Sequence, residues 1–211
     1  MKVKISILLF FLSSLILLAG CVSKKQEIEI SKGGEEKMGT LTGKKVLMVI
    51  APKDFRDEEF FKPRVILQSD GAQVVVASKT TDEVTGALGG KTKPDINLSE
   101  VKIQDYNAIV FVGGPGASTY FNDQQVLNLA RSAAEQDKVI GAICIAPSIL
   151  ANAGVLQGKK ATSFSSEKSN LEAKGAKFVD QSVVVDGKMV TATGPQAAEA
   201  FGQELVEVLS K

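Results

Sequence analysis

The sequence predicts an α/β domain with a doubly wound, mostly parallel sheet and helices on both of its faces. Short apolar runs recur from residue 44 onward, and segments of helical period separate them. The runs are continuous rather than alternating, which is typical of strands buried on both faces of a parallel sheet. A small β-hairpin near the C-terminus is the expected exception to the parallel order.

The individual elements follow from these two patterns. Apolar, mostly β-branched runs predict four strands, at Val46–Ile50, Val74–Ala77, Ile109–Val112 and Val139–Ile143. Helical patterns predict four helices: Asp57–Ser69, Asp123–Gln136, Pro147–Asn152, and a last one with Ala197, Phe201, Leu205 and Leu209 on one face.

Two stretches interrupt the alternation of strand and helix. Residues 81–99 contain several glycines and a proline, so we expect either a hairpin excursion or a surface loop. Near the C-terminus, VVVDGKMVTA places two β-prone runs around Asp186-Gly187, which predicts a β-hairpin.

The first 43 residues are expected to lie outside the domain of residues 44–211. Lysines, an apolar run of about 14 residues (5–18) and small residues make residues 1–20 a signal peptide. Leu18-Ala19-Gly20-Cys21 resembles the lipobox of bacterial lipoproteins, which implies cleavage before Cys21 and lipid on that cysteine. Residues 21–43 are polar, so we expect a flexible tether to the extracytoplasmic side of the cell membrane.

The composition excludes several kinds of chemistry. The chain has no histidine, which removes Cys-His and Ser-His-Asp catalysis and any histidine-ligated metal site. We therefore predict no metal and no cofactor. The net charge is +1 and no basic stripe carries interleaved aromatic residues, so a nucleic-acid partner is not expected. With Cys21 lipidated, Cys144 is the only free thiol and no disulfide can form within the chain.

Cys144 lies in GAICIAPSIL, directly after a predicted strand and before a predicted helix. In open α/β sheets, ligands bind beyond the carboxyl ends of the strands. Ala142 and Ala146 are small enough for the tight turn of a nucleophile elbow. Free amides at the helix start favour a thiolate, so we expect a lowered pKa for Cys144. The alternative is a buried cysteine that acts as a small hydrophobic residue, and its position alone leaves the two nearly even.

Two other segments are expected at the same edge of the sheet. Gly113-Gly114-Pro115-Gly116 follows a predicted strand, and the Gly114 amide could form an oxyanion hole with the Ile145 amide. A plain tight turn explains the glycines equally well. Glu59 follows the first strand, although an acidic residue also suits the first turn of a helix.

Four segments together resemble the DJ-1/PfpI superfamily: FRDEEFFKP, IVFVGGPGA, GAICIAPSILANAG and the tail that contains VVVDGKMVTATGP. They follow one another in the family's order over residues 44–211. The resemblance implies a flavodoxin-like sandwich that forms a homodimer, with Cys144 as the reactive centre. It also implies that Glu59 donates a hydrogen bond to that cysteine, which requires a protonated carboxyl with a raised pKa.

The chain departs from the family at each of its histidines. Ile145 stands where protease-type members carry histidine, and the acid that supports that histidine falls near Ser118. Phe164 stands where members of glyoxalase or deglycase type carry histidine, and Thr193 replaces an arginine found in some members. Efficient peptidase activity of the PfpI type is therefore not expected.

Three functions remain open from the sequence. The first is a cysteine hydrolase or lyase acting on small carbonyl compounds or peptides, in which Cys144 attacks and Glu59 carries the proton. Tyr120 is a candidate additional acid, although packing in the core explains an aromatic residue better. The second is a redox response in which an oxidant converts the thiol to a sulfinate. The third is a non-catalytic lipoprotein that acts as a scaffold or binds an uncharged small molecule in a pocket lined by Ile145 and Phe164.

Overall fold

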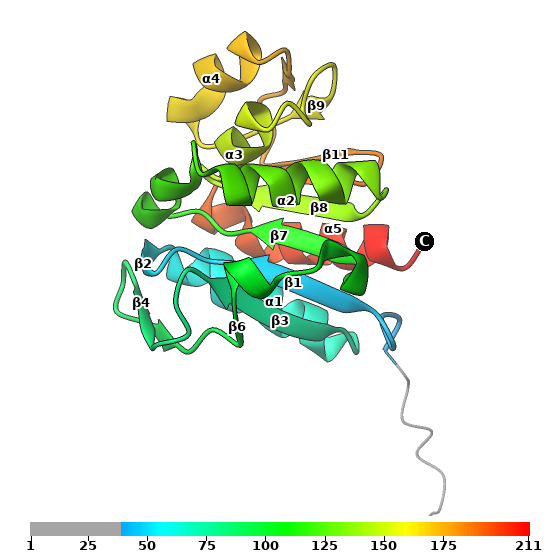
Figure 1. The fold of residues 1–211 in the computed structure, drawn as a ribbon. Helices are drawn as coiled ribbons and strands as arrows, with labels where there is room; N and C mark the ends of the chain where they lie inside the picture. Colours follow the sequence, from blue (N-terminus) through cyan, green and yellow to red (C-terminus); the bar gives the residue numbers. More distant parts are fainter. Residues whose placement is uncertain (1–38) are drawn as a thin grey trace, which may run out of the picture. The chain divides into compact units, whose positions relative to one another are not determined.

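The computed structural model describes residues 39–211. A seven-stranded sheet with the order β11-β12-β8-β7-β1-β3-β6 has helices on both faces (Figure 1). All neighbouring strands pair in parallel except β11, which is antiparallel to β12. The predicted α/β fold is confirmed. The predicted signal peptide and Cys21 lie outside the described residues.

The predicted elements are all present, and their ends lie within one residue of the predicted ones. The strands of the sheet are β1 (Lys45–Val49), β3 (Gln73–Ser78), β6 (Ile96–Asn97), β7 (Ala108–Phe111), β8 (Val139–Ile143), β11 (Val183–Asp186) and β12 (Met189–Ala192). The longer helices are α1 (Asp57–Ser69), α2 (Gln124–Glu135), α3 (Pro147–Asn152), α4 (Lys168–Ala173) and α5 (Ala198–Leu209). Of these elements, β6 and α4 were not predicted from the sequence.

Successive residues of the central strand β1 fill two separate cores, one on each face of the sheet. Leu47 and Val49 pack with residues of α2 and α3. Val46 and Met48 pack with residues of α1 and α5. Because neighbouring side chains of a strand point to opposite faces, a continuous apolar run is what such a doubly covered strand requires. Figure 1 shows α2 in front of the sheet, with α1 and α5 behind it.

Residues 81–99 form the hairpin excursion rather than a plain loop. β2 (Lys53–Phe55), β4 (Val84–Gly86) and β5 (Lys91–Thr92) make a small second sheet, and β6 then adds to the main one. The Asp57 carboxylate joins this excursion to α1, because it accepts hydrogen bonds from the amides of Leu88 at 2.8 Å and Gly90 at 2.6 Å. A third pair, β9 (Lys160–Ala161) and β10 (Lys177–Phe178), was not predicted.

The end of the predicted tether belongs to the folded domain. Leu41 is fully buried, and its amide donates to the carbonyl of Asp70 at 2.8 Å. Residues 39–43 are therefore held against the turn that follows α1, which corrects the predicted boundary at residue 43. Within residues 39–211, none of the helices is both long enough and apolar enough to cross a membrane.

Candidate active site

The candidate site lies where three adjacent strands of the sheet end. Cys144 follows β8, Gly113 and Gly114 follow β7, and Glu59 lies in the first turn of α1, after β1 and β2. Chain connections leave β1 toward β3 on one side, while β7 and β8 lie on the other side. A crevice forms at such a reversal in open α/β sheets, and ligands bind in it.

Cys144 has the strained backbone of an elbow. Its φ angle is 63°, in the left-handed region that non-glycine residues rarely adopt. Two hydrogen bonds hold it there: its amide donates to the carbonyl of Ala192 at 2.9 Å, and its carbonyl accepts from the amide of Phe164 at 2.8 Å. Neighbouring elements therefore hold Cys144 in a backbone conformation that is unfavourable for a non-glycine residue.

Gly113 allows the thiol and the carboxyl to approach each other. A Cβ at this position would lie 2.5 Å from Oε2 of Glu59 and 2.6 Å from Cβ of Cys144. Any larger residue would therefore force the two side chains apart. The carbonyl of Gly113 also accepts from the amide of Arg56 at 3.0 Å, which fixes the glycine turn against the start of α1.

Glu59 is fully buried, and neither carboxyl oxygen has a hydrogen-bond partner of good geometry among the described residues. Burial raises its pKa from 4.5 to about 7. The nearby thiol of Cys144 and the positive charge of Arg56 oppose this rise, but burial outweighs them. The raised pKa agrees with the one that the family resemblance implies. At neutral pH, Glu59 can therefore either release or accept a proton.

The predicted lowering of the Cys144 pKa is wrong for this structure. Burial and the negative charge of Glu59 raise the thiol pKa to about 12. The amides of Gly114 and Ile145 act in the opposite direction, with a smaller effect. The sulfur is thus held beside a buried carboxyl rather than exposed to the amides alone, so the thiol keeps its proton while Glu59 is ionised.

The amides of Gly114 and Ile145 are the pair expected to form an oxyanion hole beside the sulfur. Both act on the Cys144 thiol. Within residues 39–211, neither amide donates to another backbone carbonyl. Their N–H groups are therefore free to bind an oxygen that develops negative charge next to the sulfur.

Phe164 lies at the mouth of the site, with 48% of its surface exposed. A Cβ on Gly194 would lie 3.9 Å from the Phe164 ring and 3.8 Å from Oε1 of Glu59, so both side chains border this glycine. A cavity of about 330 Å³ adjoins it, lined by Ser163, Phe164, Ser165, Lys168, Phe178, Asp180, Thr193 and Gln196. Ile145 is not among these lining residues, so the expected pocket lined by both Ile145 and Phe164 is not this cavity.

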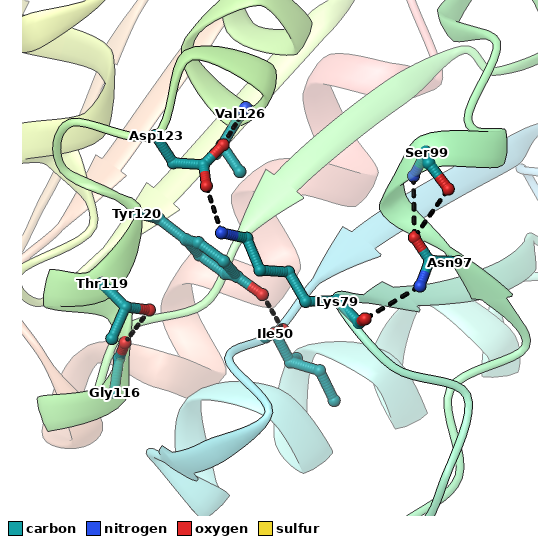
Figure 2. A network of polar contacts seen from close by, with 9 residues as sticks. All are labelled: Ile50, Lys79, Asn97, Ser99, Gly116, Thr119, Tyr120, Asp123 and Val126. Atoms are coloured by element: carbon teal, nitrogen blue, oxygen red, sulfur yellow. Dashed lines mark hydrogen bonds and ion pairs between the residues drawn. The ribbon is translucent and has the colours of Figure 1, made fainter.

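Tyr120 does not line the site. It is 1% exposed, and its hydroxyl donates to the carbonyl of Ile50 at 2.9 Å (Figure 2). Burial raises its pKa to about 12. Lys79 lies over the ring and pairs with Asp123, the residue that caps α2. Tyr120 is therefore a packing residue with a satisfied hydroxyl, which corrects the expectation that it lines the pocket.

Sequence reasoning missed one charged residue at the site, Arg56. It directly precedes α1, and its guanidinium binds the Glu58 carboxylate through Nε at 2.8 Å and Nη2 at 3.1 Å. The available signal was its place directly before the acidic start of the predicted helix that contains Glu59. Within residues 39–211, no three histidine, cysteine, aspartate or glutamate side chains gather closely enough to hold a metal ion.

Comparison with known proteins gives a consistent result. Residues 44–208 match the DJ-1/PfpI family. The uncharacterized protein MJ0967 of Methanocaldococcus jannaschii is 43% identical over 83% of this chain and 87% of its own length. Deglycase PH1704 of Pyrococcus horikoshii is 33% identical over 78% of this chain and 99% of its own length.

Two further proteins extend the likeness. The glutathione-independent glyoxalase DJR-1.2 of Caenorhabditis elegans is 30% identical over 79% of this chain and 89% of its own length. The crystal structure of a ThiJ/PfpI domain protein from Brachyspira murdochii superposes with a TM-score of 0.77 at 34% identity, over 78% of this chain and 95% of that one. Sequence and fold agree over most of the described domain, and the chain therefore belongs to the DJ-1/PfpI family.

Proposed function

We propose that this protein is a lipid-anchored enzyme that uses Cys144 and Glu59 to transform small carbonyl compounds. The observation that carries the proposal is the Glu59 carboxyl. It is fully buried, it has no hydrogen-bond partner of good geometry among residues 39–211, it lies against Cys144, and its pKa is about 7. A general base works best with a pKa near the working pH, and no histidine is present to take this role.

The first step is attack of the thiol on an aldehyde carbon. As the S–C bond forms, the S–H proton passes to the Glu59 carboxylate. Protonation of Glu59 removes the negative charge that opposes ionisation of the sulfur. The aldehyde oxygen becomes an oxyanion, which the free amides of Gly114 and Ile145 stabilise until it takes the proton from Glu59, and Glu59 is then a carboxylate again. The product of this step is a hemithioacetal.

For a 2-oxoaldehyde the same carboxylate completes the reaction. Glu59 removes the proton from the former aldehyde carbon and returns it to the neighbouring carbon, while the proton on the former aldehyde oxygen moves to the neighbouring oxygen. The hemithioacetal thereby becomes a thioester. Water then hydrolyses the thioester and restores the Cys144 thiol. The sum is addition of one water to the 2-oxoaldehyde to give a 2-hydroxy acid, with no external oxidant. The names of the deglycase and glyoxalase relatives support a carbonyl substrate.

A redox response would use the same two side chains, and the structure favours it less. Oxidation to a sulfinate begins from the thiolate. With its pKa raised to about 12, Cys144 holds little thiolate at neutral pH. The base-assisted attack described above needs no preformed thiolate, so we prefer the carbonyl reaction.

Consumption of methylglyoxal tests the catalytic proposal. We expect activity in the wild type, none in Cys144→Ser, and a loss of at least about a hundredfold in Glu59→Gln, because base catalysis typically contributes that much. Cys21→Ser changes the other cysteine and is the matched control, with wild-type turnover expected. Equal activity in the wild type and Cys144→Ser would refute the proposal. A gain of two oxygens at Cys144 with mild peroxide, without turnover, would favour the redox function instead.

The membrane anchor rests on the lipobox-like segment and is tested separately. We expect the mature protein to begin at Cys21, to carry a lipid mass there and to sediment with membranes, whereas Cys21→Ser should not. An unmodified N-terminus before residue 21 would refute it. The homodimer implied by the family stays a prediction that light scattering of the purified protein can test.

A further inference from the structure

We propose that Arg56 forms an anion-binding subsite next to Cys144, so that the preferred substrate is a carbonyl compound that carries a carboxylate or phosphate group. This inference rests on the proposed function and names its substrate class. It depends on three features of Arg56: the position of its backbone, the edge of its guanidinium that remains free, and the charges around it.

The backbone of Arg56 is fixed against the reactive centre. Its amide donates to the carbonyl of Gly113, and a Cβ on Gly114 would lie only 2.3 Å from that amide nitrogen. The same glycine turn supplies the free Gly114 amide and lets Glu59 and Cys144 approach each other. The backbone of Arg56 therefore lies at the edge of the site, next to the Gly114 amide that would bind the substrate oxygen.

One edge of the guanidinium is already occupied. Nε and one Nη2 N–H bind Glu58, and both side chains are about one-third exposed. This contact orients the planar group without using the Nη1 edge, which has no hydrogen-bond partner among the described residues. Arginine binds carboxylate and phosphate with two parallel N–H donors, and the free edge keeps that capacity.

The charge of Arg56 reaches the reacting groups. The hydrogen bond that Arg56 donates to Glu58 raises the pKa of Arg56, and negative charge on Glu59 and Cys144 raises it further. The carboxylates near Arg56 are otherwise occupied or buried: Glu58 is paired with it, Glu59 faces the thiol, and Asp57 accepts from the amides of Leu88 and Gly90. The Nη1 edge of the guanidinium, which Glu58 does not occupy, is thus available to an anionic substrate.

Two alkylating reagents of nearly the same shape test this without any turnover. Iodoacetate is anionic and iodoacetamide is neutral, and both alkylate a thiol. Their rate ratio at Cys144, divided by the ratio for a free cysteine derivative at the same pH, isolates the effect of charge at the site. A change in the intrinsic reactivity of the sulfur alters both rates and cancels in the ratio.

We expect the normalised iodoacetate-to-iodoacetamide ratio to fall about two- to fivefold in Arg56→Gln, the size expected of a partly exposed charge pair. Arg56→Lys should retain part of the preference, and Glu58→Gln should raise the ratio because it releases the guanidinium. Higher salt should lower the wild-type ratio toward that of Arg56→Gln. Arg131→Gln is the matched control, since Arg131 is on α2 and binds Asn128 instead.

The outcomes separate the inference from the proposed function. If both reagents alkylate Cys144 and the ratio is the same in wild type and Arg56→Gln, the anion subsite is refuted and the catalytic proposal stands. If Arg131→Gln lowers the ratio equally, the effect is one of overall charge and the subsite is likewise refuted. If neither reagent alkylates Cys144 in the folded protein, while both do in urea, the reactive thiol itself is refuted.

Discussion

Replacement of Glu59 by glutamine should remove a large pH dependence of stability. In the fold, burial raises the pKa of this carboxyl from 4.5 to about 7. The shift of about 2.5 units corresponds to about 3 kcal/mol, at about 1.4 kcal/mol per unit. A carboxyl with a raised folded-state pKa contributes its stability below the unfolded pKa and loses it as the pH rises through the folded pKa. The loss is therefore complete only above about pH 7.

Between about pH 5 and pH 8 this linkage amounts to about 2.5 kcal/mol, because part of the shift is already lost at the lower pH. Glu59→Gln has no charge to bury and should lose none of this stability. The free energy of unfolding in urea, followed by far-UV circular dichroism, measures the difference. The thiol of Cys144 does not interfere, since its pKa of about 12 lies far above the range.

The comparison that matters is the change in unfolding free energy across the pH range in each variant. Glu199→Gln removes an exposed carboxyl from α5 and controls for the loss of one negative charge. We expect the wild type and this control to lose about 2.5 kcal/mol more than Glu59→Gln does. Parallel behaviour of the wild type and Glu59→Gln would refute the assignment of a buried, uncompensated carboxyl, and with it the general base.

Three further substitutions test the packing around the site. Gly113→Ala puts a Cβ 2.5 Å from Oε2 of Glu59, so we expect about 1–3 kcal/mol lower stability in urea and slower alkylation of Cys144; unchanged values would show that the thiol and carboxyl are not in close contact. Tyr120→Phe leaves the Ile50 carbonyl without its donor and should cost about 1–2 kcal/mol, with methylglyoxal consumption unaffected. A loss of methylglyoxal turnover in Tyr120→Phe with unchanged stability would instead indicate that Tyr120 belongs to the site. Asp57→Asn puts an amide group against backbone N–H donors and should lower the free energy of unfolding in urea by about 1–3 kcal/mol, whereas an unchanged value would contradict its role in holding the hairpin excursion.

The fold could be predicted from the sequence because the patterns that indicate its elements are local. Runs such as Val139–Ile143 are apolar at every position, which only a strand covered on both faces allows. Asp186-Gly187 specifies a tight turn by backbone conformation alone, and Gly187 does adopt a positive φ of 64°. The two-residue strands β9 and β10 gave no such signal, because their pairing depends on neighbours that are distant in the chain.

The site could be predicted from the sequence only in part. The elbow at Cys144 follows from a strand, small flanking residues and a proline within one short stretch. The role assigned to Tyr120 failed because the partner of its hydroxyl, the Ile50 carbonyl, is 70 residues away. Arg56 was overlooked because an arginine before an acidic helix start looks like an ordinary surface residue until its neighbours are known.

The sequence by itself determined the order of strands and helices, the place of the thiol at a strand end and the absence of histidine, since each depends on residue type and short-range spacing. Only the tertiary structure decided the protonation of the site. It buries Glu59 beside Cys144 and so raises both pKa values, whereas the local pattern predicted a lowered thiol pKa. The physical reason is that desolvation and charge repulsion depend on what surrounds a group in space, and segments far apart in the chain supply those surroundings.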